Sequence, residues 1–204
     1  MNRRDMVLGS MTALYASGQL HAAQALLGAE IPAISRTGNQ VNLPASAVRK
    51  FRASLSGKLL DSSSAAYESA RRVWNGAFDR HPALIARCSS AADIQRSIEF
   101  ARTHDLLVAV RGGGHSLPGY SSCEGGLMID LQPLQRVQVD AAKHTLRAQP
   151  GVLLGGMDRA GAKSGVAVPA GTVSHTGIAG LVEGIHQVAA HDARGERMRA
   201  VLEQ

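Results

Sequence analysis

The order of short apolar runs and amphipathic segments predicts a mixed α+β fold, with small sheets flanked by helices. An apolar run at 83–87 precedes a helical pattern that begins at Ser90, and an almost wholly apolar run follows at 106–111. A further apolar run lies at 126–131, and alternating residues within 136–149 predict a hairpin. The chain has 204 residues, 45% of them apolar, which suits one domain with extra segments or two small domains.

The first ordered element is expected at Tyr67, because Tyr67, Arg71 and Trp74 recur at helical spacing. A strand is then predicted from Ala83 to Arg87. Ser90, three residues before an acid, has the pattern of a helix cap, and the helix should run to about His104.

The run "LLVAVR" is expected to be a strand buried on both faces, and so is "GLMIDL". After the hairpin, "GVLLGGMDRAGAKSG" predicts a helix with Gly165 near its end, and "VAVPAG" predicts a last short strand. The element order is therefore β-α-β-loop-β, a hairpin and then α-β.

The segment before Tyr67 is rich in serine, alanine and basic residues. We interpret residues 31–64 as a linker, with one short helix near 45–55. Much of the formal charge of +6 lies between residues 31 and 60, which contain no acid and five basic residues: Arg36, Arg49, Lys50, Arg52 and Lys58. A solvated linker explains this charge, and with aromatic residues at only 3% no nucleic-acid partner is expected.

The N-terminus resembles a bacterial twin-arginine export signal. Arg3 and Arg4 precede a mildly apolar run, and residues 23–25 read Ala-Gln-Ala, a small-x-small cleavage pattern. This predicts an exported protein, periplasmic or extracellular, with residues 1–30 as the signal. An amphipathic N-terminal helix is the alternative, and it would leave the protein in the cytoplasm. No run of about 20 apolar residues occurs, so no stable membrane span is expected.

The two cysteines, Cys88 and Cys123, lack the spacing of a zinc site, and no metal is expected. The stretch "VRGGGHSLPGYSS" at 110–122 carries more chemical information. A G-x-G-x-x-G motif fails there, because Leu117 or Ser116 stands where glycine is required, and no lysine completes a phosphate loop.

A strand that runs into glycines and polar residues has the layout of a backbone cradle for an anion. His115 in this stretch could be a turn residue, a metal ligand, a general base or a nucleophile. The residues alone leave these alternatives open.

The stretch "VRGGGHSLPGYSSCEGGLMIDLQPLQRVQVD" closely resembles the FAD-linked oxidases of the berberine-bridge-enzyme-like family. The flanking "YESARRVWNGAFDRHPALIARCSSAADIQRSIEFARTHDLL" and "GVAVPAGTVSHTGIAGL" also match, so the resemblance covers about residues 67–181. It implies an FAD-binding PCMH-type domain over 65–181, incomplete at its C-terminal end. Residues 182–204 do not resemble the family and form a divergent tail.

The resemblance implies that FAD is the cofactor, linked covalently through His115. Val173 stands where many members carry a second linking cysteine, so we expect a single histidyl link. The substrate domain and its catalytic base are not represented, so no catalytic residue is assigned. The implied cofactor-binding residues are Arg111, Gly112, Gly113, Gly114, His115, Ser116, Gly119, Gly171, Thr172, Gly177, Ile178 and Gly180.

Two functions follow as expectations. The first is FAD-dependent oxidase activity on a small-molecule substrate, in which the flavin accepts a hydride and passes electrons to dioxygen or another acceptor. The second is a truncated, non-catalytic flavin-binding remnant, or an exported binding module without cofactor.

Overall fold

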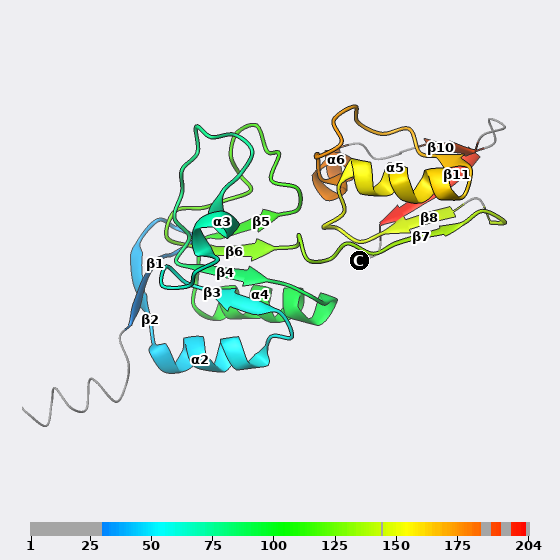
Figure 1. Cartoon of the computed structure of the whole chain (residues 1–204). Helices are drawn as coiled ribbons and strands as arrows, with labels where there is room; N and C mark the ends of the chain where they lie inside the picture. Colours follow the sequence, from blue (N-terminus) through cyan, green and yellow to red (C-terminus); the bar gives the residue numbers. More distant parts are fainter. Residues whose placement is uncertain (1–29, 144, 185–188, 193–196, 203–204) are drawn as a thin grey trace, which may run out of the picture.

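The computed structural model describes residues 30–143, 145–184, 189–192 and 197–202, which form two lobes side by side (Figure 1). The first lobe, on the left in Figure 1, contains a hairpin, a four-stranded sheet and three helices. Its elements are β1 (Ile31–Ile34), β2 (Gln40–Leu43), α2 (Ala45–Ser54), β3 (Lys58–Leu60), α3 (Tyr67–Arg71), β4 (Leu84–Arg87), α4 (Ala91–Thr103), β5 (Val108–Arg111) and β6 (Leu127–Asp130).

The four-stranded sheet has the order β3-β4-β6-β5. Strand β3 runs antiparallel to β4, whereas β4, β6 and β5 are parallel. Helix α4 connects β4 to β5, which is the crossover that parallel strands require. The register aligns Arg87, Asp130 and Arg111 at the carboxyl ends of the three parallel strands.

The core of this lobe lies on both faces of β4 and β6, because alternate side chains of a strand point to opposite faces. Ile85 and Met128 pack with Tyr67 of α3, and Leu84 and Ile129 belong to a larger cluster on the other face. The strands predicted at 83–87 and 126–131, the helix from Ser90 and the helix near 45–55 are all confirmed.

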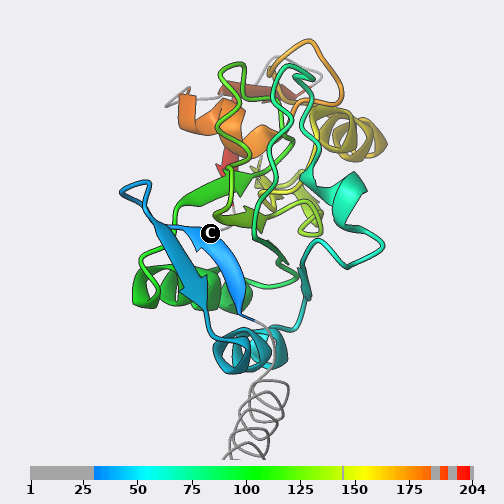
Figure 2. The ribbon, with the colours of Figure 1, turned by 90° about the vertical axis from the view of Figure 1, so that its left-hand side faces the viewer.

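The prediction of a linker over 31–64 is wrong. This segment forms β1, β2, α2 and β3, and it contributes Leu43 and Phe51 to the large core cluster. The ring of Phe51 stacks on Phe100 of α4, with centroids 4.2 Å apart and an 8° angle between the planes. Figure 2 shows the β1–β2 hairpin from the side, with α2 below it. Few apolar residues suffice here because only one face of α2, with Val48 and Phe51, is buried, and that face packs against α4.

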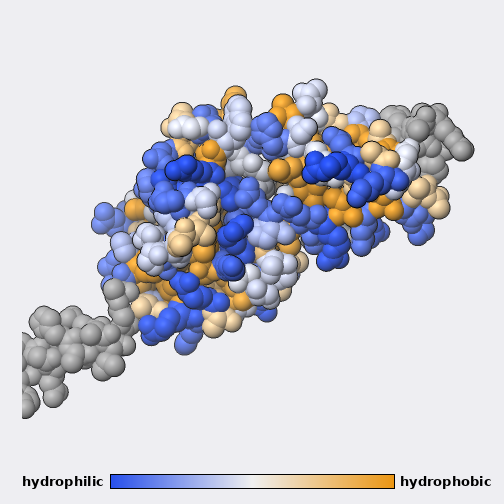
Figure 3. Space-filling model, in the orientation of Figure 1, coloured by the Kyte–Doolittle hydropathy of each residue, from blue (hydrophilic) through white to orange (hydrophobic). Residues whose placement is uncertain are grey.

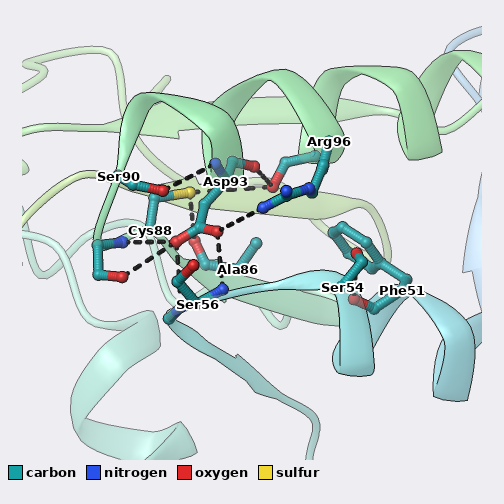
Figure 4. Close-up of polar contacts among 11 residues, drawn as sticks. Phe51, Ser54, Ser56, Ala86, Cys88, Ser90, Asp93 and Arg96 are labelled. Atoms are coloured by element: carbon teal, nitrogen blue, oxygen red, sulfur yellow. Dashed lines mark hydrogen bonds and ion pairs between the residues drawn. The ribbon is translucent and has the colours of Figure 1, made fainter.

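A buried carboxylate joins this segment to α4 (Figure 4). Asp93, in the first turn of α4, is fully buried and accepts hydrogen bonds from the backbone N–H groups of Ser56 (2.8 Å), Gly57 (3.0 Å) and Ser89 (2.9 Å). The Asp93 N–H donates to the Ser90 hydroxyl at 3.3 Å, which confirms Ser90 as the helix cap. Burial raises the pKa of Asp93, but these hydrogen bonds outweigh it and hold the pKa below its ordinary value.

Two further expectations need correction. Strand β5 is not buried on both faces: it is the edge of the sheet, and Val108 and Val110 are 40% and 53% exposed. Helix α3 ends at Arg71, so Trp74 lies on the following loop and not in the helix that its spacing predicted. An edge strand and a central strand can carry the same apolar residues, and only the strand order distinguishes them.

The second lobe is a five-stranded sheet in the order β7-β8-β11-β10-β9, with helix α5 packed against it (Figure 1). Strands β7 and β8 form the predicted hairpin, and Gly165, at φ +65°, follows the end of α5. The bounds of the elements are β7 (Val137–Asp140), β8 (Thr145–Ala148), α5 (Leu154–Lys163), β9 (Val166–Ala167), α6 (Ile178–Gly184), β10 (Ala189–Asp192) and β11 (Arg197–Leu202).

The segment 182–204 contributes strands to this sheet. β11 pairs in parallel with β8, and β10 pairs antiparallel with β9. The end of α6 also falls in this segment. The signal-like segment falls almost wholly outside the described residues, with only residue 30 inside them.

The face shown in Figure 3 is mostly hydrophilic and carries some apolar patches. Among the described residues, no helix has the length and apolar character needed to cross a bilayer. Two exposed apolar side chains, Leu117 and Tyr120, lie on the loop after β5. The site described next begins at that loop.

Candidate functional site: a glycine cradle between two lobes

The glycine loop starts where β5 ends and approaches the second lobe closely. A Cβ atom on Gly113 would lie 2.2 Å from the backbone nitrogen of Gly177, and one on Gly177 would lie 2.2 Å from that of Gly113. No side chain fits between these backbones, so both positions require glycine. Gly114 adopts φ +72°, a left-handed conformation that glycine reaches at little cost.

Backbone donors are left free along this loop. Within the described part of the chain, no backbone or side-chain acceptor forms a hydrogen bond with the N–H groups of residues 112–116. Successive free N–H groups around a left-handed residue form a concave site for an anion. Buried or half-buried donors normally have partners, so five consecutive free ones indicate a ligand site.

The loop borders a cavity of about 700 Å³, which lies within the size range of sites for small molecules and cofactors. The cavity is lined from both lobes, mainly by the glycine loop, the turn between β6 and β7, and the start of α6. Its lining residues include Gly112, Gly113, Gly114, His115, Ser116, Ser121, Leu131, Gln149, Pro150, Thr176, Gly177, Ala179, Gly180 and Leu181.

A buried ion pair anchors the base of the loop. The Arg111 guanidinium lies 3.0 Å from the carboxylate of Asp130 and donates to the Arg72 carbonyl and to the Gln132 side chain. Asp130 is fully buried and also pairs with Arg87 at 3.0 Å. These contacts fix the carboxyl ends of β4, β5 and β6 relative to one another, and with them the start of the glycine loop.

The loop between α3 and β4 runs beside the glycine loop. The Trp74 N–H donates to the Gly114 carbonyl at 3.0 Å, and the Asn75 amide donates to the Leu117 carbonyl at 2.9 Å. Arg80 donates to the carbonyl of Gly119 at 2.7 Å. Backbone carbonyls of the glycine loop are therefore paired, while its N–H groups at 112–116 stay free.

His115 lies between the lobes and contacts three side chains. Its ring stacks on the indole of Trp74, at a centroid distance of 5.0 Å and an angle of 19°. The His175 ring lies 4.9 Å away at a tilt of 55°, and the Thr176 hydroxyl lies 3.5 Å from Nδ1. Burial, with a smaller contribution from the charge of His175, lowers the pKa of His115, which favours the neutral imidazole.

The structure separates the residues predicted for the cofactor site into two groups. Gly112, Gly113, Gly114, His115, Ser116, Gly177 and Gly180 line the cavity. Arg111, Gly119, Gly171, Thr172 and Ile178 do not. Arg111 acts through its ion pair, Gly119 turns the loop at φ +74°, and Ile178 packs into the core of the second lobe.

Three residues at His115 were not among the predicted site residues: Trp74, His175 and Thr176. Thr176 and His175 lie one and two residues before Gly177, and no spacing rule distinguishes them. Trp74 is 41 residues before His115. Its spacing from Tyr67 and Arg71 predicted a helical residue and gave no indication of a site residue. Within the described residues, no three of the possible ligands His, Cys, Asp and Glu gather to hold a metal ion.

These features fit the diphosphate and ring system of FAD. Free N–H groups suit a pyrophosphate. The close approach of Gly113 and Gly177 leaves backbone rather than side chain at the cavity wall, and the His115 imidazole lies beside them. Leu131, Pro150 and Leu181 supply apolar wall for the flat part of a cofactor.

Comparison with known proteins agrees with this geometry. A family model described as an FAD binding domain matches residues 82–191, just over half the chain. The chain is 32% identical over 128 residues to (R)-6-hydroxynicotine oxidase of Paenarthrobacter nicotinovorans, covering 63% of this chain and 28% of that protein.

Solved structures share the fold. The crystal structure of 6-hydroxy-D-nicotine oxidase from Arthrobacter nicotinovorans superposes with a TM-score of 0.60 at 31% identity, over 61% of this chain and 27% of that one. The berberine-bridge-enzyme-like protein 1 of Physcomitrella patens gives a TM-score of 0.61 at 26% identity, over 65% and 29%. The chain thus spans less than a third of the length of these relatives. It belongs to the FAD-binding domain family, and it is similar to FAD-linked oxidoreductases and to a berberine-bridge-enzyme-like protein.

Proposed function

We propose that this chain binds FAD in the cavity between its lobes and forms the cofactor-binding part of an oxidoreductase that acts on a small molecule. The observation that carries the proposal is the glycine cradle, where residues 112–116 present free N–H groups at the closest approach of Gly113 and Gly177. When bound, the flavin would accept a hydride from a substrate carbon and pass the electrons to dioxygen or another acceptor.

The residues of this chain would bind and orient the cofactor. The N–H groups of the cradle would receive the pyrophosphate, and Arg111 and Asp130 would keep that loop rigid through their ion pair. The apolar side chains of Leu131 and Leu181 would exclude water from one side of the cavity.

We further propose that His115 holds the flavin by a single covalent bond. A ring nitrogen would join the methyl carbon on the flavin's benzenoid ring, with loss of two protons and transfer of two electrons through the flavin to dioxygen. The lowered pKa of His115 supports this role, because it favours the neutral imidazole, whose unprotonated nitrogen has a free lone pair. Val173, at the position of a second linking cysteine in many relatives, supports one bond rather than two.

The test is the visible spectrum of the purified 204-residue chain before and after acid precipitation. We expect a yellow protein whose colour stays with the pellet, and a flavin mass on the tryptic peptide 112–136, which contains His115. His115→Ala should abolish the covalent label. The exposed His81 provides a matched control, and His81→Ala should leave the label intact.

A colourless, folded chain that takes up no FAD on addition would contradict the proposal, and would favour the alternative of a module without cofactor. A flavin that binds but is released by acid would contradict the covalent bond alone.

We also propose that the protein is exported by the twin-arginine route. The proposal is supported by Arg3 and Arg4 ahead of a mildly apolar run and by the Ala-Gln-Ala pattern at 23–25. Fusion of residues 1–30 to a fluorescent reporter should deliver it to the periplasm of a bacterial host, and replacement of both arginines by lysine should retain it in the cytoplasm. Periplasmic delivery that survives this replacement would contradict the route.

A further inference from the structure

Trp74 occupies an unusual place for a large apolar side chain. It is 58% exposed and belongs to none of the core clusters, yet its backbone N–H is tied to Gly114 and its ring is stacked on His115. Burial in a core therefore does not hold the indole where it is. The two contacts that fix it are both with the glycine loop.

Trp74 does not line the cavity, whereas His115 does. The contact between the indole and the cavity wall is its stacking on the imidazole. A flat ring stacked at 19° restricts rotation of the imidazole about its side-chain bonds, and Thr176, at 3.5 Å from Nδ1, adds a polar contact from the second lobe. Together they define one ring orientation, with Nε2 left without a described partner.

Orientation has a large effect on the rate of a bond-forming step, because a reacting atom that is already in place does not lose rotational freedom on the way to the transition state. Resting on the proposed function of His115, we propose that Trp74 is a positioning residue for cofactor attachment, which holds the His115 imidazole in the orientation from which it bonds to the flavin. The loop before β4 would thus contribute to the site without touching the cofactor.

The surroundings of His115 also lower the pKa of its imidazole. His175, from the turn before α6, is the titratable group whose charge acts on His115, and the indole carries no charge. Burial is the main cause of the lowered pKa, and His175 acts in the same direction. The stacked indole of Trp74 and the charge of His175 thus act on His115 through different contacts, and separate variants can test them.

The contact between Trp74 and His115 can be measured without any cofactor, because Trp74 is the single tryptophan of the chain. A protonated imidazole quenches an indole stacked on it, so the emission of the cofactor-free chain should fall as the pH is lowered, with a midpoint below about 6.5. His115→Gln should remove this transition, and the control His81→Gln should retain it. His175→Gln should move the midpoint upward. A transition that survives in His115→Gln would overturn the inferred contact.

The positioning role is measured by the rate at which the cofactor-free chain acquires acid-stable flavin when FAD is added. Trp74→Ala should slow attachment by about tenfold or more, whereas Trp74→Phe, which keeps a flat ring, should stay within about threefold of the unaltered chain. The affinity for non-covalent FAD, read from quenching of flavin emission, should be unchanged in both.

Attachment at the normal rate in Trp74→Ala, or equal slowing in Trp74→Phe, would overturn the positioning role. If the proposed function is wrong, the result is different. The unaltered chain would then acquire no acid-stable flavin, but the pH dependence of the indole emission would still show the Trp74–His115 contact.

Discussion

Replacement of Asp93 by asparagine tests how firmly the segment 31–64 is attached to the rest of the first lobe. One carboxylate oxygen of Asp93 accepts from Ser56 N–H, and the other accepts from Gly57 N–H and from the N–H and hydroxyl of Ser89. An asparagine can keep only one oxygen. Its favoured orientation keeps the three bonds from Gly57 and Ser89 and places its NH₂ group against the Ser56 N–H.

The cost follows from these contacts. An orphaned buried donor costs about 1–3 kcal/mol, and loss of the negative charge weakens each remaining bond. From these two effects combined, we expect Asp93→Asn to lower the free energy of unfolding by about 2–4 kcal/mol. For a chain of this size the melting temperature should fall by roughly 5–15 °C. The exposed Asp158 on α5 provides the control, and Asp158→Asn should change stability by less than about 0.5 kcal/mol.

The pH dependence gives a second measurement. The folded-state pKa of Asp93 lies below its ordinary value, so its charge stabilises the fold fully above the unfolded pKa of about 3.9, and this contribution is lost as the pH falls toward the folded pKa. Urea unfolding followed by circular dichroism should show the largest gap between Asp93→Asn and the unaltered chain near pH 7. The gap should shrink below about pH 4. A gap that is the same at pH 7 and pH 3, or is absent at both, would refute the reasoning.

Three further predictions concern the core, the cradle and the sheet edge. Phe51→Ala should cost about 3–5 kcal/mol of unfolding free energy in the same urea assay, and a cost below about 1 kcal/mol would restore the linker interpretation. Gly113→Ala places a methyl group 2.2 Å from the Gly177 nitrogen, so it should weaken FAD binding by about tenfold or more, as measured by flavin emission. Gly76→Ala, with nothing within 4 Å of its Cβ, should bind normally, and equal loss in both would argue against the cradle. Val110→Thr should change stability by less than about 0.5 kcal/mol because Val110 is 53% exposed, whereas a cost above about 1 kcal/mol would indicate that this edge is covered in solution.

The sequence by itself determined the local elements and the family. Ser90 marks the start of α4 because a hydroxyl there satisfies a free N–H group, and Gly165 marks the end of α5 because a left-handed residue is needed. The apolar run at 126–131 identified a central strand, and β6 is fully buried. The glycines and His115 identified the cradle because their spacing and flanks match a family whose members bind FAD.

Only the tertiary structure decided which of these elements are central, which are at an edge, and which distant residues meet. The run at 106–111 is as apolar as that at 126–131, yet β5 lies at the edge, because strand order depends on how the chain crosses over through α4. Residues 31–64 have the composition of a linker. Contacts with α4 hold them in place, because Asp93 bonds to Gly57, 36 residues away, and Phe100 stacks on Phe51, 49 residues away. Trp74 and His175 reach His115 from two different lobes. Such contacts join residues far apart in sequence, so they leave no periodic pattern, and only packing in three dimensions brings them together.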